Sequence, residues 1–229
     1  MRWFNSILLV ISMIIVSCGE EALQPSPIEA GTGYFPVGVN NSWTYEVQEV
    51  NINLAGFDTV NYLLRETMMD SFVNQSNEVT YRLEREKDFF DGAGFRFDSV
   101  WTVVKTNQHV IVSENNLALL KIVFPVLDGI EWDGNSFNGQ REQQFSMTLL
   151  DADSTINGQI YSDLLRVTLA DIPQNLTGLD QKKEYYVPGI GLVAKDYTTL
   201  KYCTRDCTDD FIIEGGRVLK QSLISYDAE

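Results

Sequence analysis

The sequence holds few of the residues on which most catalytic and nucleic-acid-binding proteins depend. It has one histidine, His109, and 17 basic residues against 32 acidic ones. A lone histidine cannot build a histidine-rich zinc site, so we expect His109 to be a strand-edge residue rather than a base or a metal ligand. The acidic excess, with no basic run to offset it, repels nucleic acid and anionic lipid headgroups. We therefore expect no nucleic-acid partner.

Motifs for common chemistries are missing as well. There is no P-loop, no G-x-G-x-x-G pattern, and no G-x-S-x-G or S-x-x-K pattern around a serine. Carboxylates are abundant, but nothing in the sequence singles out a pair that would face each other across a cleft as in a glycosidase. The sequence thus predicts no catalytic residue, no metal site and no cofactor.

No segment at the N-terminus is apolar for long enough to span a bilayer. The run from Ile7 to Val16 is broken only by Ser12 and has about ten residues, whereas a spanning helix needs about 20. Preceded by the positive Arg2, this run predicts a signal peptide over residues 1–17. A plain signal peptide with a chance cysteine and a buried N-terminal helix are the alternatives.

The end of the signal peptide, IVSC, resembles the lipobox of bacterial lipoproteins. The resemblance implies that Cys18 is acylated and becomes the first residue of the mature chain. Two or three acyl chains hold a protein firmly, because each buried methylene contributes about 0.8 kcal/mol. The resemblance therefore predicts a membrane partner reached through a lipid anchor at the outer membrane.

The residues after the lipobox bear on which side of that membrane the protein occupies. Gly19 stands where an aspartate would favour retention at the inner membrane, and Glu20 and Glu21 resemble the acidic export signal of surface lipoproteins. Solvated linker residues are the alternative reading, so both the periplasmic side and the cell surface stay open. Residues 18–33 are rich in Gly, Pro, Ser and Glu and predict a flexible tether. Residues 34–229 then form one globular domain.

Cys203 and Cys207 remain as an even pair in an exported chain, which favours a disulfide. Their four-residue spacing allows the bond if the loop folds back on itself. Free thiols and a metal or redox role are the alternatives, although C-x₃-C without a nearby histidine is a poor zinc signature.

Two acidic loops have the oxygen spacing of a weak cation site. Asp151 and Asp153 match the start of a calcium loop, but the glycine and glutamate of its later positions are missing. The second loop gathers three aspartates beside the cysteines: Asp206, Asp209 and Asp210. We interpret both as solvated turns, with cation binding as the alternative.

The body of the chain alternates apolar and polar residues with a period of two. In residues 78–87, EVTYRLEREK, Val79, Tyr81 and Leu83 share one face, which indicates a strand with one wet side. Asn157-Gly158 predicts a tight hairpin, and residues 162–169 could form a helical turn, although Val167 and Thr168 favour a strand. The pattern predicts a mainly β domain of ten to twelve antiparallel strands with little helix, folded as a curved sheet, half-barrel or barrel.

Four stretches together resemble a group of Bacteroidetes-type exported lipoproteins of uncharacterised function. They are YFPVGVNNSWTYEV, FPVLDGIEWDGNSFN, INGQIYSDLLRV and YYVPGIGLVAKDY. The resemblance implies an address and a fold, and no catalytic residues. Taken by themselves the motifs are architectural: the aromatics favour a core role, Trp132 and Phe137 lie on a loop that we expect to plug or cover the sheet, and PGIG predicts a hairpin turn.

The sequence therefore favours a non-enzymatic ligand-binding or structural module of the cell envelope. A concave face of the sheet would hold an apolar or glycan ligand. The alternatives are an accessory subunit of an envelope complex, with exposed aromatics as its interface, and a glycan or peptide hydrolase that uses a carboxylate pair.

Overall fold

The computed structural model describes residues 30–150, 152–205, 207, 209 and 211–228. The signal peptide, Cys18, most of the tether, Asp151, Asp206 and Asp210 lie outside the described residues. Within the described part, none of the helical segments has the length and hydropathy to cross a bilayer.

The described residues form one short 3₁₀ helix and a series of antiparallel strands. Their bounds are η1 Thr32–Tyr34, β1 Ser42–Asn53, β2 Gly56–Val73, β3 Val79–Asp88, β4 Arg96–Lys105, β5 His109–Glu114, β6 Leu117–Val123, β7 Glu131–Asp133, β8 Gln144–Leu150, β9 Ser154–Ile156, β10 Gln159–Tyr161, β11 Leu164–Ile172, β12 Gly178–Val187, β13 Gly191–Tyr202 and β14 Ile213–Asp227.

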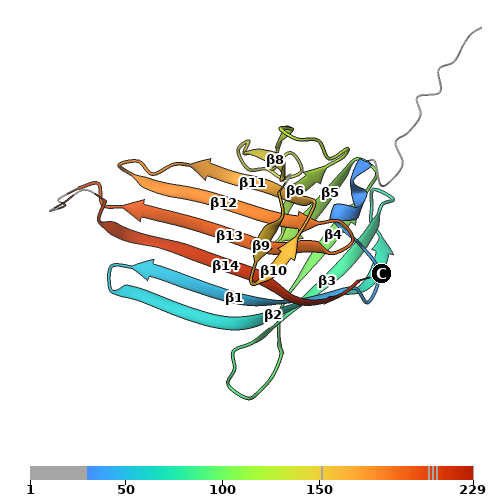
Figure 1. Ribbon diagram of the computed structural model, residues 1–229, viewed down its shortest axis with the longest axis horizontal. Coiled ribbons are helices and arrows are strands. Elements are labelled where there is room, and N and C mark those ends of the chain that lie inside the picture. The colour runs from blue at the N-terminus through green and yellow to red at the C-terminus, as the bar shows by residue number, and fades with distance from the viewer. Residues whose placement is uncertain (1–29, 151, 206, 208, 210, 229) are drawn as a thin grey trace, which may run out of the picture.

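Twelve of these strands make one continuous sheet in the order β6-β5-β4-β3-β2-β1-β14-β13-β12-β11-β8-β7. Neighbours in the sheet are mostly neighbours in sequence, and the long pairing of β1 with β14 joins the two ends of the chain. The sheet curls into a nearly closed barrel, in which β3–β6 cross beneath one half of the long strands (Figure 1). The mainly β, barrel-like fold expected from the sequence is thus confirmed.

The two edge strands of the sheet, β6 and β7, meet at a seam. The Leu120 amide donates to the Gly134 carbonyl at 2.9 Å, and Trp132 Nε1 donates to the Leu120 carbonyl at 2.8 Å. Trp132 also packs edge-on against Phe145. The segment that carries Trp132 therefore closes the wall of the barrel, whereas Phe137, expected on the same plug, is about half exposed and contacts His109.

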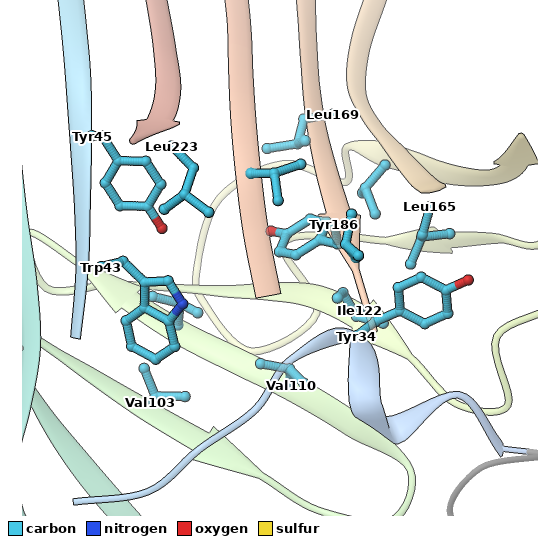
Figure 2. Packing of buried hydrophobic residues seen from close by; sticks show 14 of the residues in the cluster. Tyr34, Trp43, Tyr45, Val103, Val110, Ile122, Leu165, Leu169, Tyr186 and Leu223 are labelled. Carbon is cyan, nitrogen blue, oxygen red and sulfur yellow. The ribbon is translucent and has the colours of Figure 1, made fainter. Parts of the chain in front are cut away.

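The core fills the half of the barrel that β3–β6 cover. Trp43 and Tyr45 point inward from β1, and Tyr186 points inward from β12, toward Val103 and Val110 on the crossing strands (Figure 2). The polar atoms of the aromatics reach backbone acceptors: Trp43 Nε1 donates to the Ile190 carbonyl at 2.6 Å. Aromatic rings bury large areas and need such partners for their polar ends, so the predicted core role of these aromatics is confirmed.

Some predictions for single segments are confirmed and others are not. Asn157 and Gly158, both with positive φ, form the β9–β10 hairpin, and residues 162–169 lie largely in β11 rather than in a helix. The strands β6 and β7 have no counterpart among the predicted strands. The packed part also begins by Ala30, before the expected boundary at residue 34, because Ala30 is buried and its carbonyl accepts from the Val126 amide at 3.0 Å.

Candidate functional site

A lysine in the middle of an apolar strand is the centre of the candidate site. In β6, LALLKIV, the pairing with β5 passes from Val110–Ile122 directly to Ile111–Leu120. Lys121 is therefore the extra residue of a β-bulge, a device that re-aims a side chain. Its side chain is almost fully buried inside the barrel.

Lys121 bridges two carboxylates from opposite walls. Its Nζ lies 2.7 Å from Oε1 of Glu184 on β12 and 2.8 Å from Oε1 of Glu114 at the end of β5. Glu184 is 0% exposed, and its carboxylate also accepts from the hydroxyls of Tyr186 and Tyr197. Lys195, which pairs with Glu184 across the β12–β13 ladder, brings its Nζ within 3.4 Å. Two lysines and two glutamates thus make a charge-balanced network.

The network holds Glu184, Glu114 and Lys121 in their charged forms. Burial by itself raises the pKa of Glu184, but Lys121, Lys195 and the hydrogen bonds to the carboxylate outweigh burial and hold that pKa far below its ordinary value. The pKa of Glu114 is lowered in the same way by the two lysines, against burial. Burial lowers the pKa of Lys121, but the two carboxylates more than offset it and raise that pKa well above its ordinary value.

A second set of ion pairs lies beside this network. Arg85 Nε on β3 is 2.9 Å from Glu66 Oε1 on β2, and Arg85 Nη1 is 3.5 Å from Asp98 on β4. The Arg85 guanidinium lies 3.8 Å from the centre of the Trp101 ring, and the Lys195 ammonium lies 5.5 Å from the same centre. Trp101 therefore links this second set of ion pairs to the network through cation–π contacts.

Two grooves open on the concave face, one on each side of the β5–β6 hairpin tip. The β4 groove, of about 380 Å³, lies between β3–β4 and β13–β14. The β8 groove, of about 1210 Å³, lies on the side of β8 and β11. Glu114 and Tyr197 line both grooves. Asn115 and Asn116 form the tip with φ of 51° and 66°, a conformation that asparagine tolerates better than most residues.

A smaller cavity of about 50 Å³ lies deeper in the barrel. Its lining includes core aromatics such as Trp43 and Tyr186 and both lysines of the network. A volume of this size holds a few water molecules or a methyl-sized group, and no larger ligand. A larger molecule therefore needs a groove, such as the two above or a third of about 470 Å³ that is lined by residues of β9, β11, β13 and β14.

The carboxylate pair at the site does not match the chemistry of glycoside hydrolysis. That reaction needs one carboxylic acid that stays protonated near neutral pH, with a raised pKa. Glu114 and Glu184 both have lowered pKa values because they share Lys121. The geometry is suited to holding charges in place, and it offers no general acid from this pair.

None of the described residues named from the sequence belongs to the network. His109 begins β5 and stacks near Phe137. Cys203 and Cys207 form a disulfide with their Cα atoms 6.1 Å apart, the first of the three alternatives above. Within the part of the chain that the structure describes, no group of three or more His, Cys, Asp or Glu could hold a metal ion. Asp153 and Asp209 belong to no such group.

No motif in the sequence marks the network. Lys121 and Glu184 lie 63 positions apart, and neither belongs to a recognisable motif. The available signal was a lysine flanked by apolar residues in LALLKIV, because a buried lysine needs a partner. The sequence does not reveal which acid serves as that partner.

Comparisons with known proteins give two solved structures with distant similarity to this chain. No family model and no curated protein matches the chain. A solved structure of a candidate lipoprotein from Parabacteroides distasonis aligns over 85% of this chain and 98% of its own, with 9% identity and a TM-score of 0.40. A candidate exported protein with a YmcC-like fold from Bacteroides fragilis aligns over 84% and 98%, with 12% identity and a TM-score of 0.40.

Proposed function

We propose that this protein is a lipid-anchored envelope protein that binds a neutral, hydroxyl-rich ligand, such as a glycan, in the β4 groove. The anchor is supported by the apolar run that ends in IVSC and by the short polar segment that follows Cys18. The binding role is supported by a groove whose volume lies within the range of small-molecule sites.

The choice of ligand rests on one observation, which is that the basic side chains along the β4 groove are already paired with carboxylates. Each of its four basic side chains already has a carboxylate partner: Arg85 with Glu66, Lys87 with Asp98, Lys195 with Glu184, and Arg217 with Glu49. An anionic ligand would have to displace one of these carboxylates. A hydroxyl both donates and accepts, so it can bond to either member of an ion pair without breaking the pair.

Two further donors along this groove call for an acceptor. Trp101 Nε1 and Gln221 Nε2 are buried and have no hydrogen-bond partner among the described residues. A buried donor without an acceptor is costly, so such groups call for an explanation. A hydroxyl bound in the groove would supply the acceptor after a small side-chain shift.

Binding is tested with the full-length mature protein in detergent, titrated with a panel of neutral and acidic oligosaccharides. We expect binding to a neutral glycan, and we expect Gln221→Met, which keeps the side-chain volume and removes the donor, to weaken it about 5- to 10-fold, the value of one hydrogen bond. Gln48→Met on the outer face is the matched control and should leave binding unchanged. Binding only to acidic glycans, or no difference between the two variants, would contradict the proposal.

The anchor is tested separately. Radiolabelled palmitate should enter the wild-type protein and not Cys18→Ala, and the variant should leave the membrane fraction or accumulate unprocessed. Label that persists in Cys18→Ala would exclude this cysteine as the acylated residue.

A further inference from the structure

The described chain begins at one particular end of the barrel. The carbonyls of Thr32 and Phe35 both accept from Nζ of Lys105 at 2.8 Å. Lys105 is the last residue of β4, and its neighbour Val104 pairs with Thr80 at the start of β3. The β2–β3 hairpin tip therefore lies at the same end as the point where the tether leaves the barrel (Figure 1).

That end exposes a set of large apolar side chains. They come from the β2–β3 hairpin and from the loop before β1, whose Asn40 amide bonds to the Met68 carbonyl at 2.7 Å. We call this set the tether-end patch: Val39, Met69, Phe72, Val73 and Val79. Val73, at the tip, is 62% exposed. Exposed apolar side chains can mark an interaction surface. The opposite end also exposes large apolar side chains, among them Leu54, Phe57 and Leu176, so exposure alone does not choose between the two ends and the tether must.

The length of the tether limits which end of the barrel can meet the membrane. Cys18 precedes Ala30 by 12 positions, which span at most about 40 Å when fully extended. The strand β2 has 18 residues and separates the β2–β3 tip from the β1–β2 tip by up to about 60 Å. The extended tether is thus shorter than the extended β2 strand, which favours a barrel that meets the bilayer with its β2–β3 tip over one that meets it with its β1–β2 tip.

We propose that the tether-end patch rests in the interface of the bilayer that holds the acyl anchor. The barrel then stands upright, with the hairpins β1–β2, β11–β12 and β13–β14 and the open concave face directed away from the membrane. This orientation rests on the lipid anchor of the proposed function. The patch meets zwitterionic headgroups, because a chain of formal net charge −15 is repelled by anionic lipids.

The test places a tryptophan reporter at each end of β2 in the full-length acylated protein. Val73→Trp reports on the tether-end patch, and Leu54→Trp, at the 85% exposed tip of the β1–β2 hairpin, is the matched control. Each protein is reconstituted into phosphatidylcholine vesicles with or without brominated acyl chains, which quench a tryptophan that enters the bilayer. Val79→Trp, across the hairpin from Val73, provides a second reporter.

We expect brominated lipid to quench Val73→Trp and Val79→Trp beyond the wild-type background, and to leave Leu54→Trp at that background. Equal quenching at both ends, or quenching at Leu54→Trp alone, would overturn the orientation while leaving the anchor intact. Protein that fails to float with the vesicles would contradict the anchor itself, and flotation is measured before any quenching. The two failures are therefore distinguishable.

Discussion

Replacement of Lys121 by methionine is the most direct test of the buried charge network. Methionine keeps the volume of the aliphatic chain and removes the ammonium that contacts Glu184 at 2.7 Å and Glu114 at 2.8 Å. Glu184, with no exposed surface, is left with Lys195 at 3.4 Å and two tyrosine hydroxyls. Removing one partner of a buried ion pair costs about 3–5 kcal/mol, because the remaining charge stays desolvated.

We expect a cost near the lower end of that range, about 3 kcal/mol, because the remaining partners of Glu184 compensate part of the loss. For a domain of this size, 1 kcal/mol shifts Tm by about 2–4 °C, so Tm should fall by about 6–12 °C. Urea unfolding followed by tryptophan fluorescence measures the free energy directly. The double variant Lys121→Met/Glu184→Leu should recover part of the stability, since it removes the fully buried pair together, while Glu114 and Lys195 remain as charges without those partners.

A matched control separates burial from charge alone. Arg82→Met removes the exposed partner of Asp70, and we expect little change, because surface ion pairs contribute little. The reasoning would be refuted if Lys121→Met changed stability no more than Arg82→Met. It would equally be refuted if the double variant were as unstable as the single one.

Three further outcomes follow from the structure. The folded-state pKa of Glu184 lies below its ordinary value of 4.5. Stability should therefore hold above about pH 4.5 and decline as the pH falls further. Acid titration of the unfolding free energy would show this decline, and a flat profile would contradict it. Reduction of the disulfide, or the double variant Cys203→Ser/Cys207→Ser, should lower the free energy of unfolding by about 2 kcal/mol because the closed loop is short. Circular dichroism should still show an intact fold, and loss of the fold would assign the disulfide a larger role. Gly134→Ala places a Cβ 2.4 Å from the buried Phe145 ring and should destabilise the seam by about 1–3 kcal/mol in the same urea assay; a neutral result would mean that the ring can move aside.

Much of the fold could be predicted from local patterns. Residues 78–87 lie largely in β3, and Leu83 is buried as the alternation predicts, although Val79 is exposed and Thr80 is buried. The Asn157-Gly158 turn and the PGIG turn both join antiparallel strands. These features depend only on neighbouring residues: side-chain direction has a period of two in a strand, and positive φ suits asparagine and glycine. The β6 strand escaped prediction because LALLKIV does not alternate, and a bulge at Lys121 breaks its register.

The site could not be predicted, because it depends on contacts that no local pattern encodes. Lys121 meets Glu184 only after the sheet curls so that β6 and β12 face each other across the interior. Glu184 reads in sequence as an ordinary polar residue between lysine and tyrosine, with no sign that it is fully buried. The chain has 32 acidic residues, and the curvature and strand register of the sheet decide which of them lies beside the buried lysine.

The position of the network explains why a barrel would keep charges that apolar residues could replace. β6 is an edge strand with β5 as its ladder partner, and at the seam two hydrogen bonds to Leu120 join it to the β7 segment. Apolar contacts would tolerate a shift of β6 along the barrel, because they have no direction. Lys121 contacts both Glu114 and Glu184 in one register of β6 only. A shift of β6 would displace the ammonium and leave two desolvated carboxylates, which is costly. We infer that the network fixes the β5–β6 hairpin tip over the concave face, and with it the width of the two grooves that the tip divides.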